Sequence, residues 1–287
     1  MTHSVKILTL LFFIMSISSC NAQPKHRTGE SLTLKELLVE IREETISEAE
    51  ARLVFAEIAQ KLQEQYPTPK LDSANMQMVF PLRGKNYRDV GGKGRGFYAR
   101  LFNLFDHSIS RSHPAHDIFI YDVNRDLRDD NNGEFVDILA VNDGFVVATE
   151  TNWQEGDEFK GGNYVWLYDF TNGGLWYYAH MRQVYAVEGQ LVKAGDKLGE
   201  VGRTGFNAEN RRSDTHLHLM FLAIDENGSP RPINHYPWLK KAKTVYKTQL
   251  PTHFPRKNFD IGLIKPNNTP VYLPTNLGMF GLPSRLF

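Results

Sequence analysis

The pattern of residues changes at Phe80–Pro81, and the second pattern leaves few choices of fold. After this point short apolar or aromatic stretches alternate with glycine, asparagine and aspartate, which is typical of antiparallel β structure. Turn signals such as Asn142-Asp143-Gly144 separate several of these stretches. The predicted strands are Asp137–Ala140, Gly144–Thr149, Tyr164–Asp169, Leu175–Met181 and His216–Ile224. We therefore expect a mainly β domain.

Residues 31–66 precede this change and have the spacing of two helices. Thr33 and Ser47 each stand three residues before a glutamate, which is the arrangement of a capping box. The apolar residues that share a helical face are Leu34, Leu37, Leu38 and Ile41, and then Ala51, Phe55, Ile58 and Leu62. We predict a helical hairpin that packs on the β domain. Covering the catalytic part and contacting a partner are the alternatives.

The first thirty residues indicate export. Lys6 precedes an apolar run from Ile7 to Ile17, which is shorter than the roughly 20 residues of a membrane-spanning helix. We predict a signal peptide over residues 1–19 and a tether over residues 20–30. Ile17-Ser18-Ser19-Cys20 resembles the lipobox of bacterial lipoproteins, which implies lipidation of Cys20. The expected location is the cell envelope, facing the periplasm or cell surface, with membrane attachment by the lipid anchor only.

Charge and cysteine content exclude two classes of function. Lysine plus arginine equals aspartate plus glutamate at 33 each, so no basic excess favours a nucleic-acid partner. A single cysteine excludes a thiolate zinc cluster within the chain. A metal site would therefore be built from histidine and carboxylate ligands.

Histidines gather in three short contexts that could supply such ligands. His216 and His218 would point to one face of a strand. His113 and Asp117 are separated by three residues, a spacing that lets a loop entering a strand bring both to one metal. His180 follows Tyr178-Ala179. A catalytic zinc takes three protein ligands and leaves one open position. Ordinary surface or core histidines, and a salt bridge at Asp117, are the alternatives that each pattern leaves open by itself.

Six motifs occur in the order found in lysostaphin/LytM-type peptidases. They are His113-x-x-x-Asp117, Gly162-Asn163, Tyr178-Ala179-His180, the glycine-punctuated Gly189–Gly199, Val201-Gly202-x-Thr204-Gly205 and His216-Leu217-His218. The chain thus resembles this family between Phe80 and Leu239. The resemblance implies an antiparallel β-sheet groove with zinc at its floor. We expect a peptidase domain over residues 78–240, followed by an irregular C-terminal extension over residues 241–287.

The same resemblance implies roles for five residues. His113, Asp117 and His218 would be the zinc ligands, while His180 and His216 would face the attacked carbonyl. The sequence has no H-E-x-x-H motif, so a neutral histidine replaces the glutamate base of other zinc proteases. One histidine would act as base and the other would stabilise the oxyanion or leaving group. The expected function is zinc-dependent endopeptidase cleavage of cross-link or stem peptides of bacterial peptidoglycan.

Two features depart from the family pattern. Ala115 replaces the usual glycine, and the adjacent His116 is a rival ligand. His116 should point away from Asp117 because successive strand residues alternate, so we expect it either behind the ligands or at the surface. An insertion, Asp122–Glu134, opens like a calcium loop but has Leu127 and Gly133 where glycine and glutamate are required. We predict a solvated acidic loop that could shape one wall of the groove.

Two other functions are compatible with parts of the sequence. A catalytically silent, cell-wall-binding regulator of the same fold is the alternative, although all five polar site residues are present. Val187–Val201 resembles biotinyl- or lipoyl-type carriers and efflux adaptors, but a carrier needs an exposed lysine between methionines, and no Met-Lys-Met occurs. Neither function explains the histidines.

Overall fold

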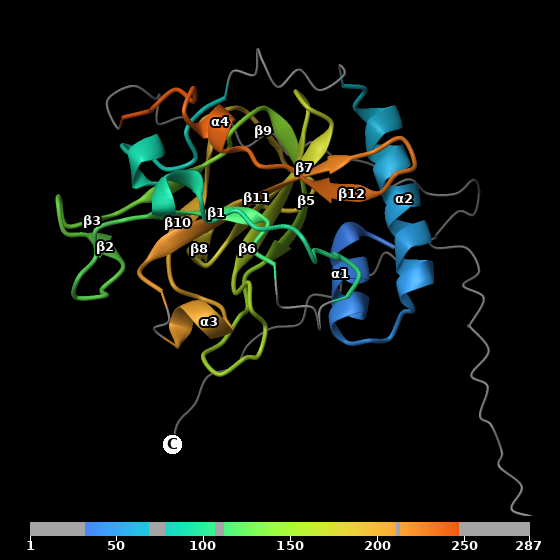
Figure 1. Ribbon diagram of the computed structural model, residues 1–287, viewed down its shortest axis with the longest axis horizontal. Coiled ribbons are helices and arrows are strands. Elements are labelled where there is room, and N and C mark those ends of the chain that lie inside the picture. Colours follow the sequence, from blue (N-terminus) through green and yellow to red (C-terminus); the bar gives the residue numbers. More distant parts are fainter. Residues whose placement is uncertain (1–31, 69–77, 107–111, 211–212, 247–287) are drawn as a thin grey trace, which may run out of the picture.

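The computed structural model describes residues 32–68, 78–106, 112–210 and 213–246 (Figure 1). The predicted signal peptide, Cys20, the tether and the extension beyond residue 246 lie outside the described residues. Among the described residues, no helix is both long enough and apolar enough to cross a membrane. The predicted domain boundaries stay predictions.

In the described residues, four α-helices and two short 3-10 helices accompany the strands. The helices are α1 (Leu34–Arg42), α2 (Glu48–Gln65), η1 (Tyr87–Asp89), η2 (Gly91–Gly94), α3 (Phe206–Glu209) and α4 (Tyr236–Leu239). The first predicted capping box forms, since Glu36 N donates to Thr33 Oγ1 at 3.2 Å and Thr33 N donates to the Glu36 carboxylate at 2.7 Å. At α2 the described contacts include only half of a box, from Glu50 N to Ser47 Oγ at 3.3 Å.

The strands of the described segments form three antiparallel sheets. They are β1 (Ala115–Phe119), β2 (Arg128–Asp129), β3 (Glu134–Phe135), β4 (Asp137–Leu139), β5 (Gly144–Glu150), β6 (Tyr164–Asp169), β7 (Gly174–Ala179), β8 (Met181–Val184), β9 (Leu191–Val192), β10 (Lys197–Val201), β11 (His216–Ile224) and β12 (Pro230–Pro232). The large sheet has the order β1-β11-β7-β6-β5-β9, with β12 also on β11. The small sheets are β4-β10-β8 and the β2–β3 hairpin. The prediction of a mainly β fold with a helical hairpin is confirmed.

One predicted strand is wrong. Leu175–Met181 is not continuous, because His180 has φ 63° and separates β7 from β8. A left-handed residue cannot continue the extended geometry of a strand. The break turns the chain into the second sheet, since β8 pairs with β10 instead of β11.

The large sheet packs a different core on each face. Leu217, Leu219 and Phe221 of β11 belong to the larger core, together with Trp176 and Trp238. On the other face, alternate residues such as Met220 pack with the helical hairpin, whose buried side chains are Leu34, Leu37, Ile41, Ala51, Phe55, Ala59 and Leu62. Because side chains alternate along a strand, His218 shares the face of Met220. The hairpin therefore packs on the sheet face that carries the candidate site.

Candidate metal and catalytic site

Strand pairing brings together residues that are far apart in the sequence. In the β1–β11 ladder Asp117 lies opposite His218, and an isolated bridge joins Tyr98 to His113 just before β1. His113 Nε2 lies 3.2 Å from Asp117 Oδ1, and His218 Nδ1 lies 3.0 Å from the same oxygen. One carboxylate oxygen thus lies close to two imidazole nitrogens, one from the segment before β1 and one from β11.

The three donors fit a zinc ion. Zinc with tetrahedral ligands at about 2.0–2.1 Å keeps neighbouring donor atoms about 3.3 Å apart. The separations of 3.2 and 3.0 Å are close to that spacing, and the donor atoms of His113, Asp117 and His218 all lie within 4.8 Å of one another. Imidazole and carboxylate are also donors that zinc prefers. These residues could therefore hold the metal.

Backbone carbonyls fix the tautomers of three histidines. His113 Nδ1 donates to Gly96 O at 2.9 Å, His180 Nδ1 to Thr204 O at 2.7 Å, and His216 Nδ1 to Asp214 O at 2.7 Å. A carbonyl only accepts, so each Nδ1 carries the hydrogen and each Nε2 keeps a lone pair. The Nε2 of His113 faces Asp117, and it donates to that carboxylate when the ring is protonated. Such an outer contact orients a ligand before a metal arrives.

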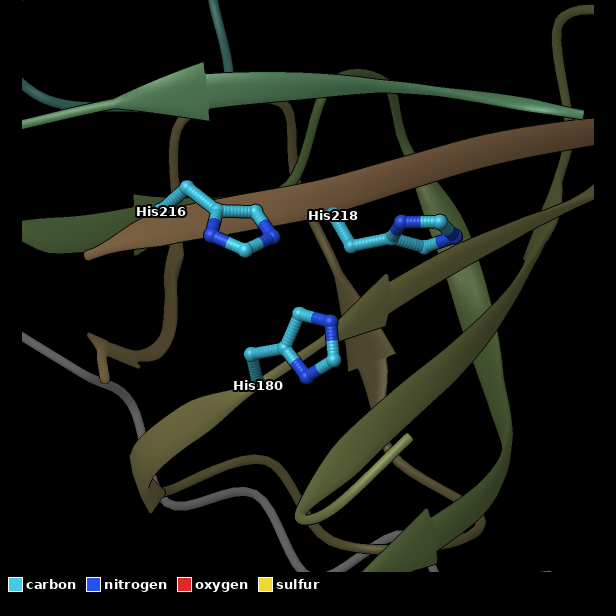
Figure 2. Close-up of side chains that lie close together, drawn as sticks. All are labelled: His180, His216 and His218. Carbon is cyan, nitrogen blue, oxygen red and sulfur yellow. The ribbon is translucent and has the colours of Figure 1, made fainter. Parts of the chain in front are cut away.

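His180 and His216 lie beside this ligand set. Figure 2 shows the rings of His180, His216 and His218 turned toward a common space. The ring centroid of His180 is 4.9 Å from that of His216 and 5.6 Å from that of His218. His216 Nε2 is 3.6 Å from Asp117 Oδ1. All five residues singled out in the sequence thus occupy one site.

The site contains a second group of possible ligands. His180, His216 and His218 also have nitrogens within 4.8 Å of one another, so His218 is shared between two sets. Only the set with Asp117 includes a negative charge to offset that of a divalent cation. Physical chemistry therefore favours His113, Asp117 and His218 as ligands, and leaves His180 and His216 for proton transfer.

The environment separates the protonation behaviour of the site residues. Burial, reinforced by the neighbouring His216 and His218, holds the pKa of His180 well below its ordinary value of 6.5. Burial also lowers the pKa of His216, against the opposing charge of Asp117. For His113 burial is outweighed by the hydrogen bond and charge of Asp117 and by Gly96, so its pKa is raised. His180 and His216 are therefore neutral near pH 7 and able to accept a proton.

Burial works against ionisation of Asp117, but its contacts with the histidines prevail. The hydrogen bonds from His113 and His218 hold the pKa of this carboxyl well below its ordinary range. Asp117 is therefore a carboxylate at neutral pH. A charged ligand that is already oriented by two imidazoles loses little freedom when a cation binds.

Two glycines allow backbones to meet beneath His180. Gly162 has φ 64°, and a Cβ there would collide with the backbone at Thr204 and Gly205. Gly205 has φ 100°, and a Cβ would strike Lys160 O. His180 N donates to Gly161 O at 3.0 Å, so this close approach sets both the main chain and the ring of His180. Both glycines belong to the sequence motifs, but their role in this close approach was not predicted.

His116 lies on the opposite face of β1 and is not at the surface. It is 1% exposed, and its Nε2 lies 2.9 Å from Asn234 Oδ1. Its ring is 4.8 Å from the buried ring of His235. The prediction that His116 points away from Asp117 agrees with this placement. A surface position, which was one of the two predicted for it, is wrong.

The acidic insertion is organised by its own hydrogen bonds. Asp122 is buried, and its two oxygens accept from Asp126 N at 3.0 Å, Leu127 N at 3.0 Å and Thr215 Oγ1 at 2.6 Å. Asp122, Asp126 and Asp130 have oxygens within 4.8 Å of one another. The oxygens of Asp122, the buried residue of this cluster, already accept hydrogen bonds from within the protein, so they stabilise the loop.

Sequence reasoning missed the residues that orient the histidines. Gly96, Thr204 and Asp214 act through backbone carbonyls, which any residue type can supply. No pattern of side chains could have identified them. His235 was missed as well, because its partner His116 stands 119 positions earlier and is brought near only by the fold.

The central part of the chain is similar to a known family. Residues 129–231 match the model of peptidase family M23. Residues 129–231 are therefore similar to an M23 peptidase domain. The predicted resemblance to lysostaphin/LytM-type peptidases is thus confirmed at the level of the family. No curated protein sequence matches the chain.

The matched segment contains three of the five site residues. His180, His216 and His218 lie inside residues 129–231, whereas His113 and Asp117 precede them. The β1–β11 ladder is what attaches Asp117 to the matched part. The structure therefore joins both halves of the candidate site.

Several solved structures resemble parts of the chain. A candidate glycyl-glycine endopeptidase lytM from Ruminococcus gnavus is 27% identical over 46% of this chain and 48% of its own, with a TM-score of 0.35. Lysostaphin from Staphylococcus simulans is 22% identical over 50% of this chain and 48% of its own (TM-score 0.32). A zinc-containing peptidase from Vibrio cholerae is 20% identical over 58% of this chain and 40% of its own (TM-score 0.35). The alignments span about half of each of these relatives or less.

Proposed function

We propose that this M23 domain is a zinc-dependent endopeptidase that cleaves cross-link or stem peptides of bacterial peptidoglycan. The observation that carries the proposal is the placement of Asp117 opposite His218, with His113 Nε2 at 3.2 Å from the same carboxylate oxygen. Two neutral imidazoles, His180 and His216, adjoin these three donors. Three ligands beside two proton-transfer groups make a hydrolytic site.

The ligands in this proposal are His113, Asp117 and His218. Zinc held there supplies Lewis-acid chemistry, polarising the scissile carbonyl and making water easier to deprotonate. Each of His180 and His216 keeps its Nε2 lone pair toward the site, because its Nδ1 hydrogen is held by a backbone carbonyl. One Nε2 accepts the proton of the attacking water, and the other, when protonated, donates to the oxyanion or the leaving amine.

The substrate and location rest on the sequence. The resemblance to lysostaphin/LytM-type peptidases supports peptidoglycan peptides as substrates, and the lipobox-like Ile17-Ser18-Ser19-Cys20 supports a lipid anchor. We propose that the protein works at the cell envelope, tethered through Cys20. Labelling with a fatty-acid analogue, and its loss in Cys20→Ala, tests the anchor.

Release of soluble fragments from purified peptidoglycan tests the activity. The zinc-loaded protein should release fragments, while the chelated protein and the His216→Ala variant should not. The variant should keep one bound zinc, which separates lost chemistry from lost metal. Absence of fragments from zinc-loaded wild-type protein, under conditions where another M23 peptidase releases them, would contradict the proposal.

A further inference from the structure

His216 is the first residue of β11, and this end of the strand is held differently from its middle. His218, two residues farther along, is paired on both sides, with β1 and with β7. His216 lies opposite Phe119, the last residue of β1, and an isolated bridge joins it to Gly202. Strand ends open more readily than strand centres. The position of His216 therefore depends on what holds the chain just before it.

The ring of His216 takes its direction from the backbone that precedes β11. Its Nδ1 donates to Asp214 O at 2.7 Å, and the ring is turned toward those of His180 and His218 (Figure 2). The peptide group that contains Asp214 O is bonded to Thr215 and is planar, so this carbonyl can rotate only about the single bonds on either side of that group. The placement of Thr215 therefore limits where His216 points.

Thr215 is held by two contacts from the segment that follows β1. Ile120 N donates to Thr215 O at 3.1 Å, and Thr215 Oγ1 donates to Asp122 Oδ2 at 2.6 Å. Arg203 Nη1, at 3.4 Å from the same hydroxyl, is a donor, so Asp122 supplies the acceptor. Thr215 is 0% exposed, and a buried hydroxyl that loses its acceptor destabilises its surroundings. Asp122 thus fixes both ends of the β1–β11 pairing at this point.

The inserted loop after β1 is folded around the Asp122 carboxylate. Asp126 N donates to Asp122 Oδ1 and Leu127 N donates to Asp122 Oδ2, both at 3.0 Å. Arg125 and Leu127 have φ 61° and 73°, conformations that residues with a side chain rarely adopt. Such a backbone persists only where its surroundings determine it strongly. The two amide donors therefore hold the carboxylate in its direction toward β11.

We propose that Asp122 is a positioning residue, which acts through Thr215 to hold His216 in the orientation that proton transfer requires. The acidic insertion then contributes to the reaction from outside the ligand set, by closing the β1–β11 ladder next to His216. This role rests on the peptidase function proposed above. Because Asp117 and His218 lie inside the ladder, loss of the contact lowers the rate of proton transfer and leaves zinc bound.

Two substitutions of Thr215 test the contact and leave the amide donors of the loop in place. Thr215→Val removes the hydroxyl and keeps a β-branched side chain of similar size, whereas Thr215→Ser keeps the hydroxyl. In the full-length, zinc-loaded protein, Thr215→Val should lower kcat for release of fragments from purified peptidoglycan by about 10- to 100-fold, the effect of a displaced catalytic group. KM and zinc content should change little, and Thr215→Ser should recover most of kcat. Equal losses in both variants, or a higher KM with unchanged kcat, would overturn the proposal.

Another buried carboxylate of the insertion provides the control. Asp122→Asn replaces one of two accepting oxygens by a donor, so it should lower kcat at least as much as Thr215→Val. Asp129 is 3% exposed, forms an ion pair with Lys85 and accepts from Asn131. Asp129→Asn disturbs the same insertion without touching Thr215, and it should keep the kcat of the wild type. Equal losses in Asp122→Asn and Asp129→Asn would overturn the proposal.

A double variant separates positioning from a general loss of structure. In the His216→Ala background, Thr215→Val should lower kcat no further, because its effect passes through the ring that is already missing. A purely structural role would lower kcat by the same factor in both backgrounds. A further loss of about tenfold or more in His216→Ala/Thr215→Val would therefore overturn the proposal.

An NMR signal of His216 tests the contact without any activity. The Nδ1–H that is bonded to Asp214 O should give an imidazole N–H signal in the wild type and in Thr215→Ser, identified by its absence in His216→Ala. Thr215→Val should broaden or remove this signal, because the carbonyl is no longer held. An unchanged signal in Thr215→Val would overturn the proposal. If the wild type releases no fragments, the peptidase function is refuted, and this signal alone decides whether Asp122 positions His216.

Discussion

Two groups of histidines lie on opposite faces of the same sheet. On one face His113, His180, His216 and His218 surround the Asp117 carboxylate. On the other, His116 and His235 meet in the core at 4.8 Å between ring centroids, next to Trp176. Adjacent positions of one strand, His116 and Asp117, thus enter environments that differ in kind.

The two groups differ in what surrounds the unprotonated imidazole nitrogens. At the site, a carboxylate and convergent nitrogens leave donors aimed at one point. In the core, His116 Nδ1 and His235 Nε2 are buried and have no hydrogen-bond partner among the described residues. Burial holds both imidazoles neutral, lowering the pKa of His116 and lowering that of His235 to about 3. Clustered histidines therefore make a metal site only where charge and geometry agree.

The largest expected effect separates the two faces directly. Asp117→Asn should lose zinc and reduce kcat/KM by about 10⁴-fold or more, because the metal contributes several kcal/mol to the transition state. His116→Gln, one residue away, should keep one zinc and most of the activity. Metal analysis and peptide hydrolysis measure both. If Asp117→Asn kept zinc and His116→Gln lost it, the metal would lie on the face of His116 and His235, and the ligand assignment would be wrong.

The next effect divides ligands from proton-transfer groups within the site. His180→Ala and His216→Ala should each lower kcat by about 10²–10⁴-fold, the contribution of general acid–base catalysis, while zinc stays bound. His218→Ala should lose both zinc and activity. If His218→Ala kept its zinc and His180→Ala lost it, the assignment of His113, Asp117 and His218 as the ligands would be wrong.

Burial of His235 beside His116 should make the stability of the fold depend on pH in the acid range. His235 has a folded pKa of about 3 and an unfolded pKa of about 6.5, so the unfolded chain binds the extra proton first. Stability is therefore full above pH 6.5 and falls as pH drops toward 3. Between pH 7 and pH 5 this one group should cost about 2 kcal/mol. Urea unfolding of the wild type and of His235→Gln should differ by that amount in their pH dependence; parallel curves would contradict it.

The smallest effect concerns two different pH ranges at the site. The raised pKa of His113 means that protons compete with zinc already above pH 6.5, so affinity should fall by about tenfold per pH unit for one proton. The lowered pKa values of His180 and His216 mean that kcat at saturating zinc should fall only below pH 6.5. Zinc titrations and saturated rates across pH 5–8 compare the two. A kcat that falls at higher pH than zinc affinity would contradict these assignments.

Local patterns predicted much of the fold. Short apolar stretches separated by glycine and asparagine turns led to largely correct strands. The alternation from His216 to Leu219 placed both histidines on one face, although β11 as a whole is buried on both faces. Helix α1 followed from the Thr33 cap and an apolar stripe. The break at His180 could not be predicted in this way. Its left-handed backbone is stabilised by Gly161 and Thr204, which are distant in sequence or act through their main chain.

Sequence by itself determined the kinds of groups available: four histidines and one aspartate in the order of the family motifs, a mainly β region, a helical hairpin and balanced charge. Tertiary structure alone decided which histidines meet Asp117 and which are buried with His235. It also decided that the hairpin closes the sheet face beside the site. The reason is physical: side-chain type and local period are properties of neighbours in the chain, whereas distances between donors are set by strand register and packing.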